Sequence, residues 1–174
     1  MTKLYRMFSE GEGFMDIKRD KYLNDLINRM HNGMIKVVTG IRRCGKSYLL
    51  FNIFKNYLLE QGVPASHIIM IELDQRKNKK YRDPDVILDY IESLIEEDGQ
   101  YYIMLDEVQM LQEFEEVLNS LLHIRNADVY VTGSNSKFLS KDVITEFRGR
   151  GDEIHIYPLT FKEFMEAYDG DMYH

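Results

Sequence analysis

The sequence contains a single cysteine, Cys44, so no disulfide can form within its 174 residues. This cysteine usage is typical of a protein of the reducing cytoplasm. No apolar run approaches the length of a membrane span, because the richest one, residues 48–59, is interrupted by two asparagines and a lysine. Residues 1–6 also lack the apolar core of a signal peptide. These absences predict a cytoplasmic protein with no membrane partner.

Basic residues are in deficit, with 22 Lys and Arg against 29 Asp and Glu, a net charge of −7 and a pI near 5.3. A broad nucleic-acid-binding face is therefore not indicated, since binding phosphates requires clustered positive charge. The one basic stretch, residues 76–82, is interpreted either as a solvated or disordered loop or as a contact for nucleic acid or another partner. At 44% hydrophobic residues, the chain can build the core of one ordinary domain.

An eight-residue motif, G-I-R-R-C-G-K-S at 40–47, follows the apolar run 34–39. This spacing between a strand and a helix predicts a P-loop, in which backbone N–H groups and a helix N-terminus face a phosphate. Lys46 is expected to reach the β- and γ-phosphates of a nucleotide, and the Ser47 hydroxyl to ligate Mg²⁺. The residues expected to bind the nucleotide are Gly40, Ile41, Arg42, Arg43, Cys44, Gly45, Lys46, Ser47 and Tyr48.

A second motif, residues 101–107, is an apolar strand that ends in two adjacent carboxylates. Asp106 is expected to hold Mg²⁺, while Glu107 orients and deprotonates the attacking water. Adjacent residues at a strand end point in different directions, so one can face the metal and the other the γ-phosphate. The alternative interpretation is a solvated turn after a buried strand.

Two further segments carry candidate catalytic residues. Ser134 and Asn135 follow the fourth predicted strand, where a short polar side chain could touch the γ-phosphate or the attacking water; the same residues also suit a turn and helix cap. Arg150, or as second choice Arg148, could act as an arginine finger in a neighbouring subunit, which requires an oligomer. The alternative there is a solvated basic turn.

Cys44 lies near a helix N-terminus and two arginines, conditions that lower the pKa of a thiol. The sequence therefore predicts that bound nucleotide blocks alkylation of Cys44. The five histidines show no ligand spacing, so no metal other than Mg²⁺ is predicted.

Strands alternate with amphipathic helices, which predicts an α/β fold whose parallel sheet is covered on both faces. The predicted strands are 34–39, 68–73, 101–105, 129–131 and 153–157. Five helices are predicted. One covers residues 23–30, one runs from the P-loop to about Glu60, one extends from 83 to 98–99, and one covers 114–122. The last helix begins with a capping box formed by Thr160 and Glu163. Both main motifs then fall at the carboxyl ends of strands, where such sheets bind ligands.

Taken together, the P-loop, I-M-L-D-E-V-Q, V-T-G-S-N-S and G-R-G-D-E-I-H-I-Y-P-L-T-F-K-E-F resemble the prokaryotic AAA-type ATPases of the AAA+ superfamily. The resemblance covers about residue 17 to the end and leaves residues 1–16 as an N-terminal arm. It implies a three-layer P-loop core with strand order 5-1-4-3-2, ATP or ADP with Mg²⁺ as ligands, and the roles given above for Lys46, Ser47, Asp106 and Glu107. Longer members of the family carry a C-terminal region, so the chain is expected to comprise the ATPase core alone.

The leading hypothesis is Mg²⁺-dependent ATP hydrolysis that drives or gates an unknown partner or effector domain. The alternative is an ATP-gated switch with little turnover. A GTPase is disfavoured, because residues 106–109 lack the glycine of a D-x-x-G switch and residues 78–81 lack the aspartate that reads guanine. A small-molecule kinase stays open, although the sequence shows no arginine-rich lid or acceptor pocket.

Overall fold

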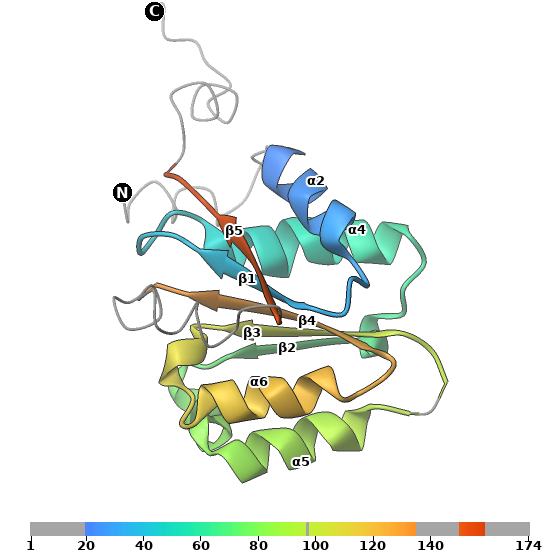
Figure 1. Cartoon of the computed structure of the whole chain (residues 1–174), viewed down its shortest axis with the longest axis vertical. Helices are drawn as coiled ribbons and strands as arrows, with labels where there is room; N and C mark the ends of the chain where they lie inside the picture. Colours follow the sequence, from blue (N-terminus) through green and yellow to red (C-terminus); the bar gives the residue numbers. More distant parts are fainter. Residues whose placement is uncertain (1–19, 97, 135–149, 159–174) are drawn as a thin grey trace, which may run out of the picture.

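The computed structural model describes residues 20–96, 98–134 and 150–158. Its centre is a five-stranded sheet in which all paired strands run parallel (Figure 1). The strands are β1 (Ile35–Thr39), β2 (Ile68–Glu72), β3 (Tyr101–Asp106), β4 (Ala127–Gly133) and β5 (Gly151–His155). Their spatial order is β2-β3-β4-β1-β5, which is the predicted order 5-1-4-3-2 read from the opposite edge.

Helices cover both faces of the sheet and so form three layers (Figure 1). One face carries α2 (Asp20–Arg29) and α4 (Lys55–Glu60), and the other carries α5 (Pro84–Leu94) and α6 (Phe114–Leu122). Side chains of β3 alternate between two cores: Ile103 and Leu105 pack with α5 and α6, whereas Tyr102 and Met104 pack toward α4. All six residues of β3 are buried, as expected for an inner strand covered on both sides.

The helix after the P-loop ends at Glu60, as predicted, but it is not uniformly α-helical. It begins as α3 (Lys46–Tyr48), continues as the π-helical segment η1 (Leu49–Phe54) and ends as α4. Wider π turns are frequently found at functional sites, and this one begins two residues after Ser47. No helix in the described part of the chain combines the length and low charge that crossing a bilayer requires.

The predicted bounds of several elements are wrong. Helix α5 ends at Leu94 instead of reaching 98–99, because the extended chain after it is held by tertiary contacts: the Glu96 N–H donates to Tyr101 Oη (3.3 Å). Strand β4 is longer than 129–131 because it pairs with β3 from Ala127. Strand β5 begins and ends two residues earlier than predicted, since its register with β1 starts at Gly151.

The basic segment is also ordered, contrary to its interpretation as a loop. Residues Arg76–Arg82 form a 3₁₀ helix, η3. Asn78 Nδ2 donates to the Glu72 carbonyl (2.9 Å), and Arg82 Nε donates to the Leu73 carbonyl (2.8 Å), so both ends of the helix are tied to the end of β2. The predicted N-terminal arm (1–16) and the 160–163 capping box lie outside the described residues.

Candidate functional site

The P-loop leaves β1 at the carboxyl edge of the sheet and is shaped by glycine. Gly40 has φ +148°, and a Cβ placed on it would lie 2.5 Å from the Ile156 carbonyl oxygen and 2.7 Å from Cys44 Sγ. Gly45, at the other end of the loop, has φ +97°. Both positions therefore require glycine, and the loop stays tight enough for its backbone N–H groups to curl around a phosphate.

We expect Gly40→Ala to destabilise the fold by about 2–3 kcal/mol and to abolish nucleotide binding, since the new methyl group forces the loop away from Ile156. Gly62→Ala is the matched control: Gly62 also has positive φ (+88°), but nothing lies within 4 Å of its Cβ position. The control should cost about 1 kcal/mol and leave binding intact. Thermal denaturation and fluorescent-nucleotide titration measure both effects; equal nucleotide affinity in the two variants would contradict the prediction.

Lys46 is held inside the P-loop and is only 4% exposed. Its Nζ donates to the carbonyl oxygens of Gly40 (3.0 Å) and Ile41 (2.8 Å). The ammonium group therefore already lies against the concave side of the loop. A phosphate oxygen is a stronger acceptor for it than a neutral carbonyl, because the hydrogen bond becomes charge-assisted on both sides.

Ser47 and Asp106 meet across the ends of α3 and β3. Ser47 Oγ lies 2.7 and 2.8 Å from the two Asp106 carboxylate oxygens, and Thr132 Oγ1 donates to Asp106 Oδ1 at 2.5 Å. Asp106 is nearly buried, and this burial raises its pKa; hydrogen bonds from Thr132 and Ser47 oppose the shift, while the negative charge of Glu107 adds to it.

A divalent cation fits this arrangement. A hydroxyl beside a desolvated carboxylate is the donor set that Mg²⁺ uses in P-loops, with the remaining ligands supplied by phosphate and water. Among the described residues, no group of three or more His, Cys, Asp or Glu side chains could hold a metal by itself. Ser47 and Asp106 are therefore the residues that would hold Mg²⁺, together with the nucleotide.

We expect Asp106→Asn to raise the free energy of unfolding at neutral pH by about 1 kcal/mol, or Tm by about 2–4 °C. Because the pKa of Asp106 is raised in the native state, folding favours the protonated acid. The free energy of unfolding of the wild type therefore falls as the pH rises from 3.8, the ordinary pKa of an aspartate, through the raised pKa of Asp106. The Tm difference should therefore disappear in acid, and Mg²⁺-ATP should stabilise only the wild type. A lower Tm for the variant at neutral pH would refute this assignment.

Glu107 diverges from its neighbour, as predicted for adjacent carboxylates. Its backbone is left-handed (φ 56°, ψ 52°), and its N–H donates to Thr132 Oγ1 (2.9 Å). Its Oε2 accepts hydrogen bonds from Ser134 Oγ (2.7 Å) and from Gln109 Nε2. A left-handed non-glycine residue is strained, and such strain is concentrated at functional sites.

Sequence reasoning missed two residues of this site. Thr132 is fully buried and bridges the two carboxylate residues, since its Oγ1 accepts from the Glu107 N–H and donates to Asp106. Gln109 holds Glu107, and its own Oε1 is a buried oxygen without a partner in the described structure. Thr132 could have been identified as a candidate because it is a polar residue at the end of an apolar strand. Gln109 entered the sequence analysis only as part of the motif that carries the family resemblance.

The remaining predicted residues have different outcomes. Arg150 lies at the start of β5, where its carbonyl accepts the Ile35 N–H (2.7 Å) and its Nη1 donates to Asn119 (3.1 Å). Arg150 therefore lies at the amino-terminal ends of the strands, whereas the P-loop lies at their carboxyl-terminal ends, so Arg150 does not join the site of its own chain. Its action in a neighbouring subunit stays a prediction. Asn135 and Arg148 lie outside the described residues.

Within the P-loop, Ile41, Arg42 and Arg43 are exposed, whereas Cys44 is 3% exposed and belongs to the core under α4. The prediction that nucleotide blocks alkylation of Cys44 requires an accessible thiol, whereas Cys44 packs inward beneath Gly40. Protection from alkylation by nucleotide no longer follows, since burial already shields this sulfur.

Comparison with known proteins agrees with this geometry. Residues 32–165 match the family model described as an AAA domain. An uncharacterised protein of Haemophilus influenzae is 35% identical over 156 residues, and the uncharacterised protein MJ1544 of Methanocaldococcus jannaschii is 29% identical over 154. These matches cover 89% and 86% of this chain but only 39% and 32% of the relatives.

Solved structures share the fold at low sequence identity. The ORC1 protein of Aeropyrum pernix, in complex with DNA, has a TM-score of 0.60 at 14% identity, covering 89% of this chain and 49% of that one. The Saccharomyces cerevisiae Hsp104:casein complex has a TM-score of 0.61 at 13% identity, with coverages of 86% and 28%. A DNA polymerase III gamma subunit-related protein of Thermotoga maritima has a TM-score of 0.59 at 12% identity, with coverages of 87% and 51%. The chain belongs to the AAA domain family and carries an AAA+ P-loop ATPase core.

Proposed function

We propose that the chain binds ATP and hydrolyses it in a Mg²⁺-dependent reaction. One observation carries the proposal: a continuous hydrogen-bonded path connects the P-loop serine to the candidate general base. The path runs from Ser47 to Asp106, through Thr132 to the Glu107 backbone, and from the Glu107 carboxylate to Ser134. Elements far apart in the sequence thus hold a metal-binding pair and a second carboxylate at one sheet edge.

In this mechanism the P-loop N–H groups and Lys46 bind the β- and γ-phosphates and stabilise the charge that spreads over the γ-phosphoryl oxygens. Ser47 and Asp106 would hold Mg²⁺, which would supply further neutralisation of the phosphate charge when bound. The Glu107 carboxylate accepts a proton from water as the water oxygen bonds to the γ-phosphorus and the bond from that phosphorus to the β–γ bridging oxygen breaks. Ser134 and Gln109 orient the carboxylate through Oε2.

A second candidate is an ATP-gated switch with little turnover. The observation that favours it is the double engagement of Glu107, whose Oε2 accepts from both Ser134 and Gln109. With both donors on Oε2, that oxygen is not free to accept the proton of an attacking water, so water activation would be slow until one donor moves away. In either case the work driven by ATP belongs to a partner or an effector domain, and we propose that Arg150 completes the site of a neighbouring copy in an oligomer.

The two candidates are separated by phosphate release from this chain with excess ATP, with and without Mg²⁺. Continuous release of many phosphates per chain, lost when Mg²⁺ is chelated, supports hydrolysis. Nucleotide binding with no more than one phosphate released per chain supports the switch. Failure to bind ATP at all would overturn both.

A further inference from the structure

The 3₁₀ helix η3 presents an ordered array of cations beside the nucleotide site. Its five basic residues are Arg76, Lys77, Lys79, Lys80 and Arg82. Because a 3₁₀ helix has three residues per turn, positions three apart are eclipsed: Arg76, Lys79 and Arg82 form one row. One turn rises about 6 Å, so the row can meet successive phosphates of an extended strand. No ion pair within the described ranges neutralises any of the five.

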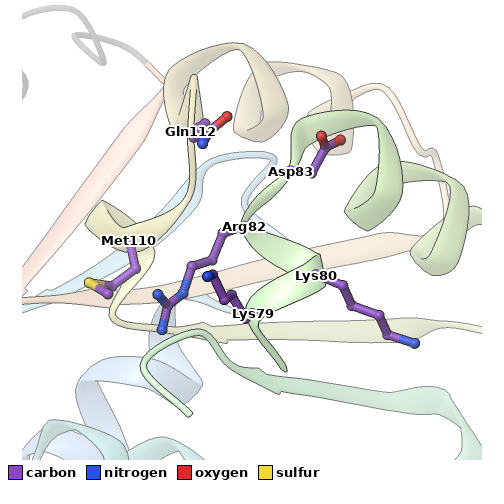
Figure 2. Close-up of a pocket in the computed structure, with 6 residues that line it drawn as sticks. All are labelled: Lys79, Lys80, Arg82, Asp83, Met110 and Gln112. Carbon is purple, nitrogen blue, oxygen red and sulfur yellow. The ribbon is translucent and has the colours of Figure 1, made fainter. Parts of the chain in front are cut away.

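An open hollow of about 590 Å³ lies against this helix, lined by Lys79, Lys80, Arg82, Asp83, Met110 and Gln112. In Figure 2 the side chains of Lys79 and Arg82 extend to the same side of η3, toward Met110, whereas Lys80 extends the other way. The single acid in the lining, Asp83, caps α5 by accepting the N–H groups of Asp85 (3.0 Å) and Val86 (3.1 Å). The hollow is therefore suited to an anion.

Short hydrogen-bonded paths connect the segments around the hollow to the backbone carbonyl groups of Asp106 and Glu107. The Gln112 N–H donates to the Arg82 carbonyl (3.0 Å), and the Met110 N–H donates to the Glu107 carbonyl (2.9 Å). On the other side, Arg82 Nε donates to the Leu73 carbonyl, and the Leu73 N–H donates to the Asp106 carbonyl (3.1 Å). A ligand that moves Arg82 would therefore act on the segments that position Asp106 and Glu107.

We propose that η3 and its hollow bind the phosphate backbone of a single-stranded nucleic acid, and that this binding alters the rate of ATP turnover. Aromatic side chains favour nucleic acid over an acidic polypeptide: the rings of Tyr81 and Tyr90 are 4.6 Å apart, Tyr90 is 36% exposed, and Lys80 Nζ lies 4.9 Å from the Tyr81 ring. Bases stack on such rings without sequence preference. The effect on turnover, unlike the binding, rests on the proposed ATPase function.

The binding test uses fluorescence anisotropy of a labelled oligo(dT) of about 20 nucleotides at about 50 mM salt. The test variant is Lys77→Ala/Lys79→Ala/Lys80→Ala. The control, Lys21→Ala/Lys55→Ala/Arg125→Ala, removes the same charge from other parts of the surface. We expect at least a tenfold loss of affinity in the test variant and less than twofold in the control, with the slope of log affinity against log salt shallower by about 2 in the test variant. Thermal denaturation confirms that both variants are folded.

Equal losses in the two variants would overturn the proposal, because net charge alone would then explain binding. Tighter binding of poly-glutamate than of oligo(dT) would also overturn it in favour of an acidic protein partner. Lys46→Ala should keep oligo(dT) affinity, since the P-loop is separate from η3.

The second test measures turnover. Oligo(dT) should change the rate of phosphate release at least twofold in the wild type and should have no effect in the test variant, whose basal rate is unchanged. A wild-type rate that oligo(dT) does not alter would refute the coupling. A chain that binds oligo(dT) but releases no phosphate would instead reject the ATPase proposal alone.

Discussion

Replacing Glu107 with glutamine is expected to lower ATP turnover by a factor of about 10²–10⁴ while leaving ATP affinity within a few fold. The amide cannot accept the proton of the attacking water at neutral pH. It retains an oxygen that can accept the hydrogen bonds of Ser134 Oγ and Gln109 Nε2, so the side chain keeps its position. Binding depends instead on the P-loop and Lys46, which the substitution does not touch.

The matched control is Glu113→Gln. Glu113 is also a left-handed glutamate (φ 49°), lies six residues farther along the same segment and is exposed. Its substitution should leave turnover near the wild-type value. Steady-state phosphate release gives the rates, and titration with a fluorescent ATP analogue gives the affinities. Turnover by Glu107→Gln at the wild-type rate would exclude Glu107 as the base and direct attention to another acceptor.

Local patterns predicted the P-loop, the aspartate–glutamate pair and the type of nearly every element. Each of these features is encoded within a few adjacent residues: Gly40 and Gly45 satisfy unusual backbone angles, and β3 is a continuous apolar run because it is covered on both faces. The sheet order followed from the family resemblance and is confirmed by the strand pairing.

Features that depend on cross-strand register or tertiary contacts were not predicted. Thr132 acts in the site only because β3 and β4 align so that Leu105 pairs with Val131, which places the next residues of both strands side by side. Helix α5 ends early because the Tyr101 hydroxyl holds the chain beyond it. The basic segment becomes the helix η3 because Asn78 and Arg82 bond to carbonyls at the end of β2. None of these partners is adjacent in sequence.

A buried ion pair, which was also not predicted from the sequence, lies near the amino-terminal ends of β1 and β4. Lys36 is fully buried in β1, and its Nζ donates to Asp128 Oδ1 of the neighbouring strand and lies 4.9 Å from the Tyr130 ring. Asp128 Oδ2 accepts from Tyr130 Oη (2.6 Å) and from the His31 N–H (3.0 Å). Burial lowers the pKa of Lys36, and the hydrogen bond and charge of Asp128 oppose this shift.

Asp128→Asn is therefore expected to destabilise the fold by about 3–5 kcal/mol, or about 10 °C in Tm, since it leaves a buried ammonium without its counter-charge. Asp152→Asn is the control, because its pair with Arg29 (2.9 Å) is partly exposed and should contribute less than about 1 kcal/mol. Thermal and urea denaturation measure both differences.

The pH dependence separates loss of charge pairing from simple loss of packing. In Asp128→Asn the pKa of Lys36 falls further, so the unfolded chain holds a proton that the native state lacks between that lowered value and the ordinary 10.5. Stability of the variant must then rise with pH across that interval, and its deficit relative to the wild type must shrink between the pKa of Lys36 in the variant and the pKa of Lys36 in the wild type, which burial also lowers. Adding Lys36→Met should also recover part of the loss, because no unpaired charge remains buried. A deficit that is independent of pH and unrelieved in the double variant would show that Asp128 acts through its hydrogen bonds to Tyr130 and His31 rather than through its charge.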